Sequence, residues 1–194
     1  TGVLLEAAAG LATKYAFDFT PEEEKAVIHS FMDAAKKLGI TSINDVQSYY
    51  HGNMGSIEVY HQMDTDNELT IRIHAAPDLT GDLDAVVEDR KKYSSEKLRI
   101  DHVKQFLDGV ITTHTALVLD DYADEPGNKG EELCDLDAIR KAVPEAHKRG
   151  LSVKLHSCGD RSARYALDYI EAAINKYGKN ECRHAIEHLE RCRL

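Results

Sequence analysis

Two histidines stand at the ends of predicted strands and could bind a metal ion. His156 ends the buried run 151–156, and His188 ends the run 182–188. Neutral imidazole is the commonest protein ligand for metals, and barrel enzymes place their chemistry at the C-terminal ends of strands. Two such imidazoles at neighbouring strand ends can share one divalent ion and leave room for water. Each could instead be a structural histidine with satisfied hydrogen bonds, and the residues alone leave both interpretations open.

A lysine on another apolar strand is a third candidate. Lys104 lies near the C-terminal end of the run 100–107. An ammonium group is costly to bury without a partner. One interpretation pairs Lys104 with Asp108 or with another acid. The other makes it a metal-bridging lysine, carboxylated on its amine so that it offers oxygen ligands.

Four more residues are candidates for the surroundings of the substrate or of the metal ligands. Asp160 and Arg161 open a predicted helix, where they could act only as its N-cap and as a salt-bridging residue. Asp108 closes the strand of Lys104, and Glu6 lies in the N-terminal lead-in. The segment 110–131 is long and rich in turn formers, and loops of that length in a compact domain are usually functional or mobile.

The other histidines and the cysteines show no catalytic spacing. We interpret four histidines as structural or solvent-facing: His74, His102, His114 and His184. The sequence contains no GxSxG and no HExxH.

The candidate residues lie in an alternation of strands and helices. Thr20 and Pro21 predict a helix start, with an inward stripe of Val27, Phe31, Ala34, Ala35 and Leu38. Further helices are predicted near 55–63, over 81–98, from Asp135 to Gly150, and from Asp160, as the N-cap, to Gly178. Five strands are predicted at 40–43, 69–73, 100–107, 151–156 and 182–188.

This order predicts an α/β fold with right-handed βαβ units and a parallel sheet. An open doubly wound sheet is one arrangement, but no GxGxxG or GxxxxGK[ST] follows a strand, so a nucleotide-binding domain is disfavoured. Histidines at strand ends favour a partial (β/α)8 TIM-type barrel.

Composition limits the class of protein and its partners. The chain has 194 residues, of which 42% are hydrophobic and 30% charged, with a net charge of −10. These values are typical of a globular domain. The negative charge disfavours nucleic acid and anionic membrane as partners. Four cysteines without CxxC spacing predict reduced thiols in a cytoplasmic protein, and we find no membrane span and no signal peptide.

Several segments resemble the amidohydrolase superfamily, in the branch called amidohydrolase family 3. The most specific are HSCGDRS at 156–162 and RHAIEH at 183–188. Ser157 and Cys158 stand where that branch usually has small or apolar residues. The other matching segments follow the family's order along the chain: TGVLLE at 1–6, GITS at 39–42, VKQFLDG at 103–109, TAL at 115–117, YADEP at 122–126, and Gly130.

The resemblance implies one or two divalent metals, most simply zinc, at the mouth of a (β/α)8 barrel beside a small β-sandwich. It makes His156 and His188 the ligands on strands five and six, and Lys104 the candidate bridge on strand four. Such enzymes also have a His-x-His pair on strand one and a proton-accepting Asp on strand eight, and neither is present here. We therefore expect residues 1–194 to be the central part of a hydrolase barrel, roughly strands two to six, without the first and last strands or the β-sandwich.

The expected activity of the parent protein is metal-dependent hydrolysis of amide or other non-peptide C–N bonds in small molecules. The general base is absent, so we expect the isolated chain to be inactive. The alternative is a non-catalytic metal-binding or interaction domain of α/β type. Open sheet edges in a partial barrel also predict a homo-oligomer or edge-to-edge association.

Overall fold

The computed structural model describes residues 2, 4, 8, 10–16, 18–46 and 55–192. Glu6, one of the predicted site residues, lies outside them. The chain divides into two compact units. The first unit is Thr1–Asp78 with Asp84–His102, and the second is Leu79–Leu83 with Val103–Leu194.

The first unit contains a short parallel sheet with helices. Its strands run in the order β1-β2-β3 and pair in parallel, with Ser42 opposite Arg72 and Ile73 opposite Leu98. The elements, in chain order, are α1 (Gly10–Ala16), α2 (Pro21–Lys37), β1 (Ser42–Asp45), α3 (Ile57–Thr65), β2 (Arg72–Ala75), α4 (Leu83–Lys92) and β3 (Leu98–Arg99).

The start of α2 follows the prediction, but its buried face does not. Thr20 is the N-cap and forms a capping box with Glu23. The buried apolar residues are Ile28, Met32 and Ala35, whereas Phe31 is 46% exposed and Leu38 is 77% exposed. The prediction is confirmed for Ala35 and wrong for Phe31 and Leu38, because two apolar rows run along the helix and packing buries the row that contains Ile28 and Met32.

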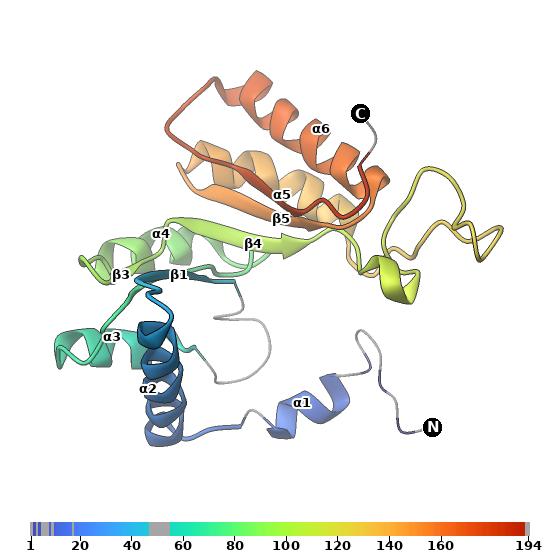
Figure 1. Cartoon of the computed structure of the whole chain (residues 1–194). Helices are drawn as coiled ribbons and strands as arrows, with labels where there is room; N and C mark the ends of the chain where they lie inside the picture. The colour runs from blue at the N-terminus through green and yellow to red at the C-terminus, as the bar shows by residue number, and fades with distance from the viewer. Residues whose placement is uncertain are drawn as a thin grey trace. The chain divides into compact units, whose positions relative to one another are not determined.

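The second unit contains the sheet β4-β5-β6. β5 and β6 are parallel, with His156 opposite Glu187 and Ser157 opposite His188. The helices α5 and α6 lie side by side along β5 (Figure 1). The elements, in chain order, are β4 (His102–Phe106), the 3-10 turn η2 (Ile111–Thr113), α5 (Leu136–Lys148), β5 (Ser152–Ser157), α6 (Asp160–Tyr177) and β6 (Ala185–His188).

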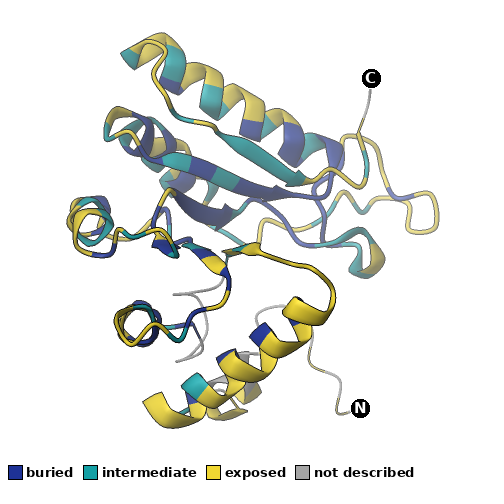
Figure 2. Cartoon of the chain, turned by 60° about the vertical axis from the view of Figure 1, so that its left-hand side comes forward, coloured by how far each residue is buried: buried dark blue, intermediate teal, exposed yellow. Residues whose placement is uncertain are grey.

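The core of the second unit is made by the apolar residues of these strands and of α5. Val103, Leu107, Val143, Val153 and Leu155 are each 0% exposed. Figure 2 shows the long helices with buried residues on one side and exposed residues on the other. Such two-sided helices stabilise the sheet by burying apolar area at roughly 25 cal/mol per Å². The sheet thereby holds the ends of β4, β5 and β6 in fixed register.

Candidate metal centre

The two strand-end histidines lie next to each other in the second unit. His156 precedes the last residue of β5 and His188 ends β6, the neighbouring parallel strand. Their ring centroids are 4.4 Å apart at an angle of 62°. His188 has a φ of +76°, so the backbone leaves the extended conformation at this residue. The two imidazoles are thus close enough to bind one ion, since zinc–nitrogen bonds of about 2.1 Å bring two ligands within a few ångströms.

The hydrogen bond of His156 decides which of its nitrogens is available. Its Nε2 lies 2.9 Å from the carbonyl oxygen of Gly109, which can only accept, so Nε2 carries the proton and donates. Nδ1 then keeps its lone pair in the neutral ring. Burial lowers the pKa of His156. The hydrogen bond to Gly109 opposes this shift, and the charges of His188 and Lys104 add to it. The ring therefore favours the neutral form that metal ligation requires.

Lys104, on the neighbouring strand β4, is paired with an acid. Its side chain is buried, and its Nζ donates to Oε2 of Glu187 at 2.6 Å. A second lysine, Lys154, lies 3.7 Å from the other oxygen of Glu187. Burial lowers the pKa of Lys104, and the contact with Glu187 opposes this shift. The prediction of an acidic partner is confirmed, but the partner is Glu187 and not Asp108.

Asp108 is occupied by four other donors. Its carboxylate accepts hydrogen bonds from the backbone N–H groups of Leu117, Cys158 and Gly159 and from the hydroxyl of Ser162, at 2.6–3.0 Å. Its side chain has 0% exposure. The carboxylate of Asp108 can be buried without a lysine partner, because these four donors replace the hydrogen bonds that it would make with water.

Asp108, His156 and Cys158 bring possible ligand atoms within 4.8 Å of one another, but they make a poor metal site. The oxygens of Asp108 are already bonded, and the His156 nitrogen that faces them carries a proton. Burial raises the pKa of Cys158 to about 12, so it remains a thiol at neutral pH. Cysteine binds metals as the thiolate.

A second histidine pair in this unit was not predicted. The backbone N–H of Val153 donates to Nδ1 of His184 at 3.1 Å, so the proton of the neutral ring is on Nε2. That nitrogen donates to Nδ1 of His147 at 2.9 Å, and Nε2 of His147 donates to the carbonyl of Gly178 at 2.8 Å. Every ring nitrogen is used. Although Cys182 completes a cluster within 4.8 Å, the chain of hydrogen bonds leaves no lone pair for a metal.

The chain matches the amidohydrolase family over residues 1–191. It belongs to that family. It is similar to the protein LONG AFTER FAR-RED 3 of Arabidopsis thaliana, with 27% identity over 98% of this chain. It is also similar to the putative amidohydrolase YtcJ of Bacillus subtilis (strain 168), with 24% identity over 93% of this chain. The chain spans 34% of the length of each of these relatives.

A solved structure supports the fold of this amidohydrolase-family chain. An uncharacterized metal-dependent hydrolase from Pyrococcus furiosus superposes with a TM-score of 0.65 and 23% identity, over 87% of this chain and 34% of that one. The similarity confirms an α/β arrangement with parallel strands. In the described part of the chain, no helix has the length and hydropathy needed to cross a membrane.

Asp160 and Arg161 contact the loop 110–131 of the amidohydrolase-family chain. Asp160 is the first residue of α6 and not its N-cap, which is Gly159. Its Oδ1 accepts from the N–H of Leu119 at 2.8 Å, and the guanidinium of Arg161 donates to the carbonyl of Lys129 at 3.2 Å. Asp160 therefore binds the backbone of the loop and is not the N-cap of its own helix.

Proposed function

We propose that this chain supplies part of the metal centre of a hydrolase that cleaves amide or other non-peptide C–N bonds in small molecules. The observation that carries the proposal is the 4.4 Å approach of the His156 and His188 rings at the C-terminal ends of adjacent parallel strands. Membership of the amidohydrolase family supports the reaction class.

In this proposal the strands of the chain are roughly strands two to six of a (β/α)8 barrel. The barrel would be completed by parts of the protein that lie outside the 34% of the relatives spanned here. The C-terminal ends of β5 and β6 are where such a barrel holds its ligands. The general base and the remaining ligands would come from other strands.

The donor set fits a divalent metal, with zinc as our choice because zinc prefers imidazole nitrogen. When bound, such an ion supplies a water nucleophile at neutral pH and polarises the substrate carbonyl. His156 would bind through Nδ1, because Nε2 is held by Gly109. His188 would supply the second nitrogen.

Lys104 has two roles open to it. As an ammonium it remains paired with Glu187, which matches the 2.6 Å contact. As a carboxylated lysine it would bridge two ions, and its lowered pKa favours the free amine that this modification needs. The loop 110–131, anchored by Asp108 and Asp160, would shape the substrate pocket. A cytoplasmic location is supported by the four cysteines, which form no disulfide.

The second candidate is a non-catalytic metal-binding or interaction domain. The observation that favours it is the ligand set itself, since two imidazoles are fewer than the three protein ligands of a catalytic zinc site. Full-length protein that lacked turnover but retained zinc would support this candidate.

Zinc calorimetry on the purified chain tests the site. We expect weak binding, because two imidazoles supply only part of a ligand shell. His156→Gln and His188→Gln should each abolish it, whereas the exposed control His61→Gln should leave it unchanged. Zinc binding that survives both site substitutions would contradict the proposal.

A further inference from the structure

The buried carboxylate of Asp108 joins three segments of the second unit. Leu117 belongs to the loop that follows β4, Cys158 and Gly159 form the turn after β5, and Ser162 lies in the first turn of α6. All four donate to Asp108 within 3.0 Å. Charge-assisted hydrogen bonds of this kind are among the stronger ones in proteins. The end of β4 is therefore fixed to the segment that immediately follows His156.

Gly109, the residue after Asp108, holds the ring of His156. Its carbonyl accepts from Nε2 at 2.9 Å. Thr115 closes the other side of Gly109, since a Cβ built there would lie 2.1 Å from the Thr115 hydroxyl oxygen. The position of this carbonyl thus depends on Asp108 on one side and on the loop on the other.

Asp108 also faces the same ring nitrogen. Its Oδ1 lies 3.7 Å from Nε2 of His156, beyond hydrogen-bond distance but close enough for a carboxylate to favour a proton there. Three groups face Nε2: the Gly109 carbonyl at 2.9 Å, the Asp108 carboxylate at 3.7 Å and the Cys158 sulfur at 3.4 Å. The two oxygens can only accept, whereas the thiol is a weak donor and a weak acceptor. The alternative tautomer would put a nitrogen lone pair against two acceptor oxygens and would leave the Gly109 carbonyl without its donor, so it is disfavoured.

We infer that Asp108 is the positioning residue that keeps the proton of His156 on Nε2 and so leaves the Nδ1 lone pair available for a ligand. The inference rests on the proposed function for its purpose, but the tautomer itself is a property of the metal-free chain. Asp108 does not touch the metal or the substrate. It acts through Gly109 and through the turn after β5, in the way that groups behind a metal ligand set its orientation and basicity.

A purely structural role would predict something different. If Asp108 only stabilises the turn, its replacement lowers the free energy of unfolding but leaves the protonation of the His156 ring as it is. If Asp108 positions the ring, the tautomer and the protection of the Nε2 proton change in protein that is still folded.

The test is ¹⁵N NMR of the histidine rings in the metal-free chain. We expect one Nε2–H tautomer for His156 in the wild type. In Asp108→Asn we expect a mixture of tautomers and roughly fivefold faster solvent exchange of the ring proton, the factor that corresponds to a hydrogen bond worth about 1 kcal/mol. The matched control is Asp160→Asn, which neutralises a second buried carboxylate, at the start of α6, that accepts from the N–H of Leu119; its His156 signals should stay unchanged.

A second, milder variant keeps the test decisive if Asp108→Asn does not fold. Ser162→Ala leaves the Asp108 carboxylate in place and removes one of its four donors, together with the contacts of the same hydroxyl with Ser157 and Gly159. It should also speed exchange of the Nε2 proton. Unchanged His156 signals in a folded Asp108→Asn, or unchanged exchange in Ser162→Ala if Asp108→Asn does not fold, would overturn the inference. Absence of zinc binding in the wild type would instead count against the proposed function, because the ring signals are read without metal.

Discussion

At the residue scale, the two histidine pairs of the second unit differ in the positions of their ring protons. In the pair of His156 and His188, a carbonyl fixes one proton and leaves the Nδ1 lone pair of His156 free. In the pair of His147 and His184, backbone groups at both ends use up every nitrogen. The same residue type thus keeps a nitrogen lone pair available in one place and forms a structural connection in the other. The difference depends on a backbone donor, Val153, that no residue spacing reveals.

The structural pair predicts acid sensitivity of the fold. Burial, and then the charge of His147, lower the pKa of His184 from 6.5 to about 4. A group with a depressed pKa in the folded state contributes stability that is complete above pH 6.5 and is lost as the pH falls toward 4, because unfolding releases the ring to take up a proton. The loss from this residue is at most about 3 kcal/mol.

Urea unfolding at a series of pH values between 7 and 4 checks this expectation. The free energy of unfolding of the wild type should fall over that range, and His184→Gln should make the fall shallower. The exposed control His61→Gln should follow the wild type. Equal slopes for wild type and His184→Gln would show that His184 is not held neutral by the fold.

Which acid meets Lys104 could not be read from the sequence. Asp108 is close along the chain, whereas Glu187 reaches Lys104 from β6, 83 positions away. The pairing of β5 with β6 places Glu187 opposite His156. The acid that pairs with Lys104 is therefore set by the arrangement of the strands and not by closeness along the chain. The two strand-end histidines were predictable because parallel strands bring their C-terminal ends together whatever the details of side-chain pairing.

At the element scale, the alternation of strands and helices was predictable and their faces were less so. Hydrophobic runs located β5 and β6, and Thr20 with Pro21 located the start of α2. The sequence missed β3, because the helix predicted over 81–98 ends at Lys92 and Leu98 instead pairs with β2. It also assigned the N-cap of α6 to Asp160, because only the structure shows that this carboxylate is taken by Leu119.

The turn between β5 and α6 requires glycine for space. A Cβ at Gly159 would lie 1.9 Å from the carbonyl oxygen of Leu117. Gly159→Ala must therefore push the loop away from the turn that follows His156. We expect it to lower the free energy of unfolding by about 2 kcal/mol or more. Urea denaturation measures the change, with the exposed α6 substitution Glu171→Ala as a control expected within about 0.5 kcal/mol of wild type. An equally small effect of Gly159→Ala would mean that the close approach is not maintained.

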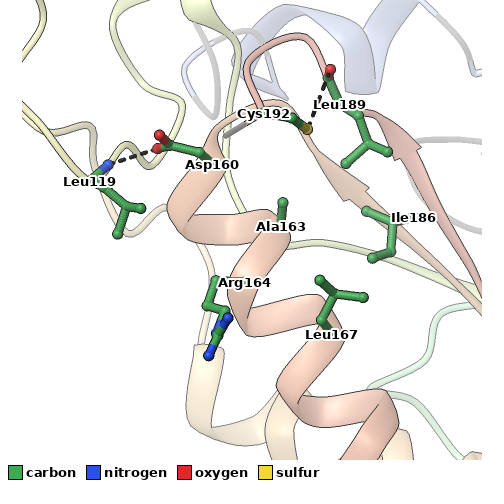
Figure 3. A pocket seen from close by; sticks show the side chains of 8 residues that line it. All are labelled: Leu119, Asp160, Ala163, Arg164, Leu167, Ile186, Leu189 and Cys192. Atoms are coloured by element: carbon green, nitrogen blue, oxygen red, sulfur yellow. Dashed lines mark hydrogen bonds between the residues drawn. The ribbon is translucent and has the colours of Figure 1, made fainter. Parts of the chain in front are cut away.

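At the scale of the whole molecule, the second unit exposes an apolar groove beside its edge strand. β6 is the last strand of its sheet in the described part of the chain. A groove of about 500 Å³ lies between β6 and α6 and is bordered by Ile186, Leu189, Ala163 and Leu167 (Figure 3). Leu167 is 56% exposed and Leu189 is 41% exposed. Exposed apolar patches and open strand edges mark surfaces for association.

We predict that a second copy of the chain covers this groove in solution. Sedimentation of the purified chain should show a dimer or larger species, and Leu167→Glu should shift it toward the monomer. Leu38→Glu, at the exposed C-cap of α2, should leave the association unchanged. A wild type that stays monomeric at high concentration would rule out this form of association.

The share of its relatives that the chain covers bears on its activity. The chain spans about a third of its relatives, and the proposed mechanism takes its general base from a strand outside it. Loss of one member of a catalytic unit typically costs orders of magnitude in rate. Assays of this chain against a panel of amides with added zinc or manganese should therefore show no turnover. Measurable hydrolysis that disappears in His156→Gln would show that the residues present here suffice.

The central claim is that His156 and His188 bind one ion, and a crystal structure of the chain soaked with zinc tests it most directly. Anomalous scattering locates the metal without reference to any assumed ligand. The account predicts a zinc peak about 2.1 Å from Nδ1 of His156 and from a ring nitrogen of His188, with the Gly109 carbonyl still accepting from Nε2. A zinc peak between His147, Cys182 and His184, with none at His156, would contradict it.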